Sequence, residues 1–165
     1  MSITIERITQ SNLSAFKEIR LRALQDTPQA FGSTFARESQ FTETEWLERA
    51  KRWDGETGIG FLAIDNGHEC GIAGGLIDAD DRTRVVLVSM WTAPTHRRSG
   101  IGRALVDHVL GWARGREART LRLMVTSGNE PAIRFYEKLG FARTGRTEPY
   151  PNDPGLIEYE MSRPI

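Results

Sequence analysis

The sequence predicts an α/β (α+β) domain built around a mostly antiparallel sheet. Strand and helix patterns follow one another along the chain, Asn66-Gly67 between two apolar runs is typical of a tight type I′ hairpin turn, and Gly100 begins a long amphipathic stretch. A chain of 165 residues with 39% hydrophobic and 27% charged residues has the size and composition of one globular domain. We therefore expect residues 1–165 to form a single domain.

The first half of the chain predicts one strand, two helices and a meander. Ile3, Ile5 and Ile8 alternate with polar residues as a short strand, and residues 13–23 place apolar side chains at helical spacing. The Thr42-Glu43-Thr44-Glu45 run has the form of a capping box and opens a second helix. Three apolar stretches then predict antiparallel neighbouring strands: 59–64, 72–77 and 85–91.

The second half predicts two further helices among strands. Apolar residues from Ile101 to Trp112 share one helical face, residues 121–125 alternate as a strand, and residues 132–139 form a helical stripe that Gly140 closes. Gly145 to Gly155 holds three prolines and is predicted to be a loop before a last strand at 157–161. The order β-α-α-β-β-β-α-β-α, with one or two strands after it, gives six to seven strands and about four helices.

Charge and cysteine content exclude several classes of partner. Twenty-two basic residues balance twenty-two acidic ones, so we expect no nucleic-acid and no membrane partner. Cys70 is the only cysteine and the three histidines lack metal-site spacing, so no metal is expected. The N-terminus lacks an apolar run behind a basic start, and no stretch approaches the about 18 apolar residues of a spanning helix. The chain is therefore expected to be cytoplasmic.

The turn before the long helix is the first candidate site. Thr92-Ala93-Pro94 ends a strand, and Gly100 and Gly102 stand where the helix begins, so its unpaired N–H groups can face an anion. A Gly-x-Gly pattern alone fits a simple tight turn equally well. No Gly-Lys-Ser/Thr follows, as a Walker A loop requires, and Leu105 occupies the third glycine position of a dinucleotide fingerprint.

Two motifs in this region resemble those of the GNAT superfamily of N-acetyltransferases, in its bacterial form. Arg97-Arg98-Ser99-Gly100-Ile101-Gly102 is similar to the superfamily's Gln/Arg-x-x-Gly-x-Gly/Ala coenzyme motif. The run from Asn129 to Phe141 is similar to its Asn-x-x-Ala-x-x-x-Tyr helix ending in Gly-Phe. The resemblance covers residues 85–141 and implies a GNAT fold, with a central mixed, mostly antiparallel sheet.

The resemblance also implies acetyl-CoA as co-substrate and a set of residues that bind it. Backbone groups of Trp91 and Thr92 would pair with the pantetheine arm. Asn129 would hydrogen-bond the same arm, although an Asn before Glu-Pro is equally explained as a helix cap. The residues expected around the pyrophosphate are Arg97, Arg98, Ser99, Gly100, Ile101, Gly102 and Arg103.

Tyr136 matches the tyrosine that often stabilises the departing thiolate in this superfamily, whereas the alternative is a core tyrosine. Many relatives carry a general base on the fourth strand, but residues 86–91 contain no carboxylate. The base is therefore left open. The candidates are Glu38, Glu43, Glu158, Glu160, or a chain of water that Ser89 could help to hold.

The predicted function is N-acetyl transfer from acetyl-CoA directly to an amine acceptor. The alternative is a noncatalytic acyl-CoA-binding module of the same fold. Residues 20–33 also resemble a stretch of bacterial GNAT proteins, whose counterparts wall the acceptor site. Phe31, Phe35, Phe41 and Trp46 would form an apolar wall or belong to the core, and Cys70 is expected to be a packed residue. The acceptor's identity is open, and a homodimer is possible.

Overall fold

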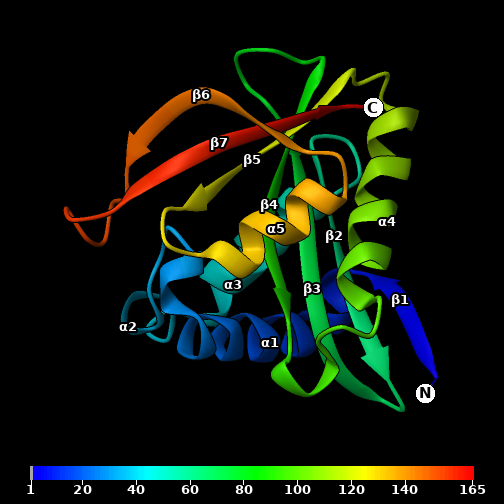
Figure 1. Cartoon of the computed structure of the whole chain (residues 1–165). Coiled ribbons are helices and arrows are strands. Elements are labelled where there is room, and N and C mark those ends of the chain that lie inside the picture. The colour runs from blue at the N-terminus through cyan, green and yellow to red at the C-terminus, as the bar shows by residue number, and fades with distance from the viewer. Residues whose placement is uncertain (1) are drawn as a thin grey trace.

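A computed structural model describes residues 2–165 and has a seven-stranded mixed sheet at its centre (Figure 1). The strand order is β1-β2-β3-β4-β5-β7-β6, and every neighbouring pair is antiparallel except β4 and β5. The strands are β1 (Ile3–Arg7), β2 (Gly58–Asp65), β3 (His68–Ile77), β4 (Arg84–Thr92), β5 (Thr120–Thr126), β6 (Ala142–Pro149) and β7 (Ile157–Pro164). The α-helices are α1 (Leu13–Asp26), α2 (Phe35–Glu38), α3 (Glu43–Ala50), α4 (Ile101–Gly115) and α5 (Glu130–Lys138).

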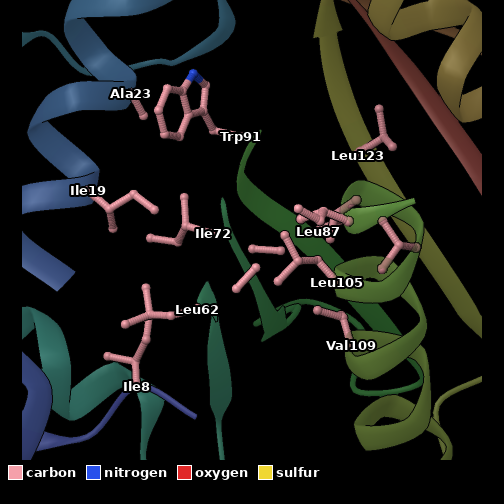
Figure 2. Close-up of a cluster of buried hydrophobic side chains, with 14 of the residues drawn as sticks. Ile8, Ile19, Ala23, Leu62, Ile72, Leu87, Trp91, Leu105, Val109 and Leu123 are labelled. Atoms are coloured by element: carbon pink, nitrogen blue, oxygen red, sulfur yellow. The ribbon is translucent and has the colours of Figure 1, made fainter. Parts of the chain in front are cut away.

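Helices cover both faces of the sheet and meet it through buried apolar side chains. In Figure 2, Ile19 of α1 lies toward Ile72 of β3 on one face, while Leu105 and Val109 of α4 lie beside Leu87 of β4 on the other. All five side chains are at most 5% exposed. Since burying a Leu, Ile or Val side chain contributes about 1.5–3 kcal/mol, these two layers of contacts hold the helices on the sheet.

The structure confirms two predictions that rest on a few neighbouring residues, the hairpin turn and the capping box. Asp65 pairs with His68 across a turn in which Asn66 and Gly67 have φ of 49° and 83°, as a type I′ hairpin requires. Thr42 Oγ1 accepts from the Glu45 N–H at 3.2 Å, and Glu45 Oε1 accepts from the Thr42 N–H at 3.2 Å. The capping box therefore starts α3 at the predicted place.

One part of the sequence prediction was wrong. The segment from Gly145 was expected to be a loop, but β6 continues to Pro149, and β7 extends beyond residue 161 to Pro164. Almost all residues of β6 are exposed, and its pairing with β7 is irregular near Gly145. Its sequence therefore lacks the alternation of apolar and polar residues that predicts a strand. The single turn of α2 had no counterpart in the prediction; with it the structure has five α-helices, in agreement with the about four that were expected.

Strands β4 and β5 are parallel neighbours for only a short distance. The register joins Arg84 to Thr120 and ends at Val86 opposite Arg122. Beyond this point Ser89 has a φ of 57°, and the register of β4 with β3 shifts nearby. Such a bulge bends a strand, so the remainder of β4 turns away from β5 while staying paired with β3. Its edge toward β5 has no strand partner.

Within residues 2–165, no helix combines the length and the apolar character needed to cross a bilayer. Across the same residues, no group of three or more His, Cys, Asp or Glu side chains is arranged to hold a metal ion.

Candidate functional site

A cavity of about 1080 Å³ lies where β4 and β5 separate. Its lining includes most of β4, the second half of β5, the start of α4 and much of α5. Residues after α1 and around α3 complete it on the other side, among them Phe31, Arg49 and Arg52. The cavity therefore joins the glycine-rich turn to the face of the sheet that α1 and α3 cover.

The turn before α4 exposes the first N–H groups of that helix. Gly100 is the N-cap residue, with a φ of 87° that favours glycine, and its position offers no side-chain cap. Arg98 also has a positive φ, 62°, so the chain reverses sharply just before the helix. Four N–H groups at a helix start lack intrahelical acceptors, and the helix dipole adds partial positive charge there. The turn is suited to a phosphate anion.

The arginines of the turn differ in their contacts. The Arg97 side chain is half exposed but is bonded within the protein: its Nε donates to the Thr92 carbonyl at 3.1 Å and its Nη2 to Asp26 at 2.6 Å. Arg98 and Arg103 line the cavity and make no hydrogen bond or ion pair to side chains or backbone in residues 2–165. These two guanidinium groups are the ones with donors to spare for an anion.

Most of the predicted coenzyme-binding residues line this cavity. They are Trp91, Thr92, Arg97, Arg98, Gly100, Gly102, Arg103, Asn129 and Tyr136. The side chains of Ser99 and Ile101 lie elsewhere: the Ser99 hydroxyl donates to the His96 carbonyl, and Ile101 is 2% exposed within the core. A role for their backbone N–H groups stays a prediction.

Asn129 caps α5, because its Oδ1 accepts from the Ala132 N–H at 3.4 Å. The helix-cap alternative is thus confirmed, and the residue also lines the cavity. The contact with a pantetheine arm stays a prediction.

Tyr136 joins the core to the cavity. Its ring packs edge to face on Phe135 and Phe141, with centroids 5.3 and 5.7 Å away, and the residue is 9% exposed. The hydroxyl makes no hydrogen bond to residues 2–165, yet the residue lines the cavity. Burial raises the pKa of Tyr136, so the phenol keeps its proton at neutral pH. It is a hydrogen-bond donor without an internal acceptor.

Three of the four carboxylates considered as a base are poorly placed. Glu38 is fully buried between Arg20 and Arg49; burial opposes its ionisation, but these arginines lower its pKa to about 2. Glu43 is exposed at the start of α3 and does not line the cavity. Glu160 is bonded to Arg122 at 3.1 Å and to Thr144 at 2.9 Å.

Glu158, in β7, is the one carboxylate of the four that lines the cavity. Its side chain makes no hydrogen bond or ion pair with residues 2–165. Burial, and then the nearby charge of Glu148, raise the pKa of Glu158 above its ordinary value. A carboxylate with a raised pKa is a better proton acceptor near neutral pH than an unperturbed one.

The side of the cavity formed by α1, α3 and the residues after α1 also contains groups that the sequence alone did not single out. Arg20 bonds both oxygens of Glu38 at 3.0 Å and donates to Ser89 at 3.3 Å. The helical spacing of α1 could have identified this residue, because it places Arg20 on the apolar face next to Ile19. In the structure Arg20 is 5% exposed. Of the four aromatics proposed as a wall, Phe31 alone lines the cavity. Trp46 is 1% exposed in the core.

Cys70 is 1% exposed, and burial raises its pKa. Its Sγ lies 3.4 Å from the Ala63 carbonyl. The thiol is a packed core group, as predicted, and is unsuited to nucleophilic attack.

A profile of the Acetyltransferase (GNAT) family matches residues 20–141, which include both motifs and most of the cavity lining. The chain belongs to this family. It is an acetyltransferase of the GNAT type, and nothing favours the noncatalytic alternative.

Relatives of this GNAT chain act on different acceptors. It is 34% identical over 102 residues to the ribosomal-protein-bS18-alanine N-acetyltransferase of Escherichia coli, covering 61% of this chain and 67% of that one. It is 45% identical over 62 residues to streptothricin acetyltransferase of Streptomyces lavendulae, a match that covers 38% of this chain and only 33% of that protein. The structure of yncA from Salmonella typhimurium with acetyl-CoA has the same fold, with a TM-score of 0.81, 20% identity and coverage of 99% and 94%.

Gly102 offers a test of the prediction that acetyl-CoA binds at the α4 end of the cavity. A Cβ at Gly102 would lie 3.0 Å from Phe135 and 3.2 Å from Met90, so a valine there fills the space between α4 and the cavity lining. We expect acetyl-CoA at ~100 times its Kd to raise the Tm of the wild type by about 5–10 °C, and Gly102→Val to lose most of that shift.

The matched control is Gly111→Val in the same helix, where a Cβ meets nothing within 4 Å. This variant should keep the full shift. Calorimetry that finds wild-type affinity for acetyl-CoA in folded Gly102→Val protein would disprove binding at this turn.

Proposed function

We propose that this protein transfers the acetyl group of acetyl-CoA directly to an amine, with Tyr136 and Glu158 as its catalytic residues. One observation carries the proposal. A single cavity brings together the free start of α4, the unpartnered edge of β4, the Tyr136 hydroxyl and the Glu158 carboxylate.

The residues along the cavity fit acetyl-CoA in charge and in shape. The turn with Arg98 and Arg103 offers cationic and N–H donors for a pyrophosphate. The edge of β4 offers peptide groups to which an extended amide-bearing arm can add as a strand. Acetyl-CoA, when bound, supplies an acetyl thioester whose carbonyl carbon an amine can attack. The yncA relative's complex supports use of the same co-substrate.

Glu158 and Tyr136 divide the proton chemistry between them in the proposed reaction. A lysine-like amine has a pKa of about 10.4, so at neutral pH most of it is present as the ammonium ion. The ammonium must lose a proton before its nitrogen can attack. Glu158 accepts this first proton, which frees the nitrogen lone pair to attack the thioester carbonyl carbon. The second N–H proton becomes acidic once the C–N bond has formed, and it passes to the departing sulfur or to solvent, so that the products are the amide and the thiol of CoA. Tyr136 donates a hydrogen bond to the sulfur as the C–S bond breaks and negative charge develops there. Its high pKa favours this hydrogen bond over complete proton transfer.

Direct transfer is supported by the state of Cys70. An acetylated-enzyme route needs an activated nucleophile, and the only thiol is buried, with a raised pKa. The cytoplasmic location, the possible homodimer, and the expected lack of nucleic-acid, membrane and metal partners stay predictions.

A screen of amines tests the function. We expect at least one small amine or peptide N-terminus to be acetylated with consumption of one acetyl-CoA per product, measured by thiol release and product mass. Initial rates over both substrates should show a sequential pattern. Ping-pong kinetics together with an acetylated enzyme formed at a competent rate would overturn direct transfer.

Tyr136→Phe should lower kcat by about 10²-fold or more while it changes acetyl-CoA affinity little, since only the hydroxyl contact is lost. Tyr159→Phe is the matched control, because Tyr159 in β7 does not line the cavity. Turnover should be measured where the chemical step limits the rate. Equal turnover of Tyr136→Phe and wild type under those conditions would remove Tyr136 from the mechanism.

Glu158→Gln should lower kcat by about 10²-fold or more and abolish the acid limb of the kcat–pH profile. The sign follows from the role: Glu158 must be ionised to accept a proton, so the rate rises as pH increases through its raised pKa. Glu148→Gln is the informative partner variant. Because the Glu148 charge helps to raise that pKa, its removal should move the acid limb to lower pH. An unchanged profile in Glu158→Gln would assign the base elsewhere.

A further inference from the structure

Three arginines gather on the wall of the cavity that α1 and α3 provide. Arg20 comes from α1, Arg49 from α3, and Arg52 from the short turn that follows α3, and all three line the cavity. Within residues 2–165, Glu38 is the one carboxylate ion-paired with this group. We name Arg20, Glu38, Arg49 and Arg52 the arginine wall.

The arginine wall carries an excess of positive charge. Glu38 stays ionised at neutral pH and supplies one negative charge. Both of its oxygens are already occupied, by Arg20 at 3.0 Å and by Arg49 at 2.9 Å. The Arg52 side chain makes no hydrogen bond or ion pair with residues 2–165. Three guanidinium groups against one carboxylate leave a net charge of about two positive units, and these charges repel one another.

The neighbouring positive charges affect the ionisation of Arg49. Its side chain is 23% exposed and lies over the rings of Phe41 and Trp46, at 5.4 and 5.8 Å. Burial lowers the pKa of the Arg49 guanidinium; Glu38 opposes this effect, and Arg20 and Arg52 add to it. An anion between Arg49 and Arg52 would relieve the repulsion, and a guanidinium fork matches a carboxylate with two parallel hydrogen bonds.

Negative charge lies on a different element of the same cavity. Glu158 is on β7, which pairs with β5, whereas Arg49 and Arg52 are on the side of α3. Thr126, the register partner of Glu158, donates from its Oγ1 to the carbonyl of Gln29, so this part of the sheet contacts the segment that follows α1. The cavity therefore offers cations on one element and a carboxylate on another.

We infer that the arginine wall binds a carboxylate of the acceptor, so that the substrate is an amine that also carries a carboxylate, as free amino acids do. This inference rests on the proposed function and names its acceptor class. The carboxylate is held at Arg49 and Arg52, and the amine faces Glu158 and the thioester. Arg20 is a positioning residue, because Glu38 and Ser89 occupy its donors.

The test compares acids with their uncharged counterparts. Each of the common amino acids is assayed beside its α-amide, its decarboxylated amine and its aminoalkylphosphonic analogue. For the best acid, we expect kcat/KM to exceed that of its amide by at least tenfold. Arg52→Gln, which breaks no internal ion pair, should lower kcat/KM for the acid by about 10- to 100-fold through KM. It should leave the amide's kcat/KM and the Kd of acetyl-CoA within about twofold.

Arg49→Gln should show the same selective loss, with circular dichroism and Tm confirming that the variant folds. Arg114→Gln is the matched control, since Arg114 is in the last turn of α4 and does not line the cavity. It should change neither substrate's kinetics.

Several results would overturn the inference. If amides or decarboxylated amines are acetylated as fast as the acids, or if both arginine variants slow acid and amide equally, the carboxylate assignment fails while acetyl transfer to amines stands. An Arg52-dependent preference for phosphonates over carboxylates would reject the carboxylate in favour of another anion. If no amine of any charge is acetylated although acetyl-CoA binds, the proposed function fails as well.

Discussion

The separation of β4 from β5 is the constraint on which the candidate site depends. The two strands are paired from Arg84 to Val86 and no further, and the positive φ of Ser89 bends β4 away just beyond. Peptide groups left at an inner sheet edge must find partners, so such an opening is stable only where water or a ligand can enter. The same bend places Trp91 and Thr92 beside the turn that starts α4. The helix start, the strand edge and the tyrosine of α5 thereby share one cavity.

The buried pair of Arg20 and Glu38 ties the N-terminal helices to this opening. Arg20 connects α1 to α2 through Glu38 and to the bulge through Ser89. Removing one partner from a buried ion pair typically costs 3–5 kcal/mol, because a charge is left uncompensated. The pair also determines which carboxylate can act as the base in the proposed reaction. Glu38 is linked to the bulge through Arg20, but it is too strongly stabilised as an anion to accept a proton, whereas the Glu158 side chain has no ion-pair partner and is the base in the proposed reaction.

The sequence predicts those features that a short stretch of chain determines by itself. The Asn66-Gly67 hairpin, the capping box at Thr42 and the start of α4 depend on neighbouring residues, and the structure has all three. Strand β6 escaped prediction because both of its faces are exposed and its stability comes from pairing with β7. The Arg20–Glu38 contact escaped because eighteen residues separate the partners and no periodic pattern links them. Choosing Glu158 among four carboxylates likewise required knowing which one lines the cavity and lacks a cation beside it.

The protein has no net charge, yet its cavity contains two clusters of positive charge, because basic residues are concentrated at two places in the cavity lining. With equal numbers of acidic and basic residues, the molecule exerts little long-range attraction on an anion. Short-range recognition then falls to local groups, which the fold supplies at two places: Arg98 and Arg103 beside the start of α4, and the arginine wall beside α3. Between them the lining is largely apolar, with Val88, Met90 and Phe135 among its members. Charges in such surroundings are screened less than on an open surface, so each cluster acts on the part of a ligand next to it. In the proposed reaction the first cluster fixes the coenzyme and the second orients the acceptor, and the amine is left facing the one carboxylate that can take its proton.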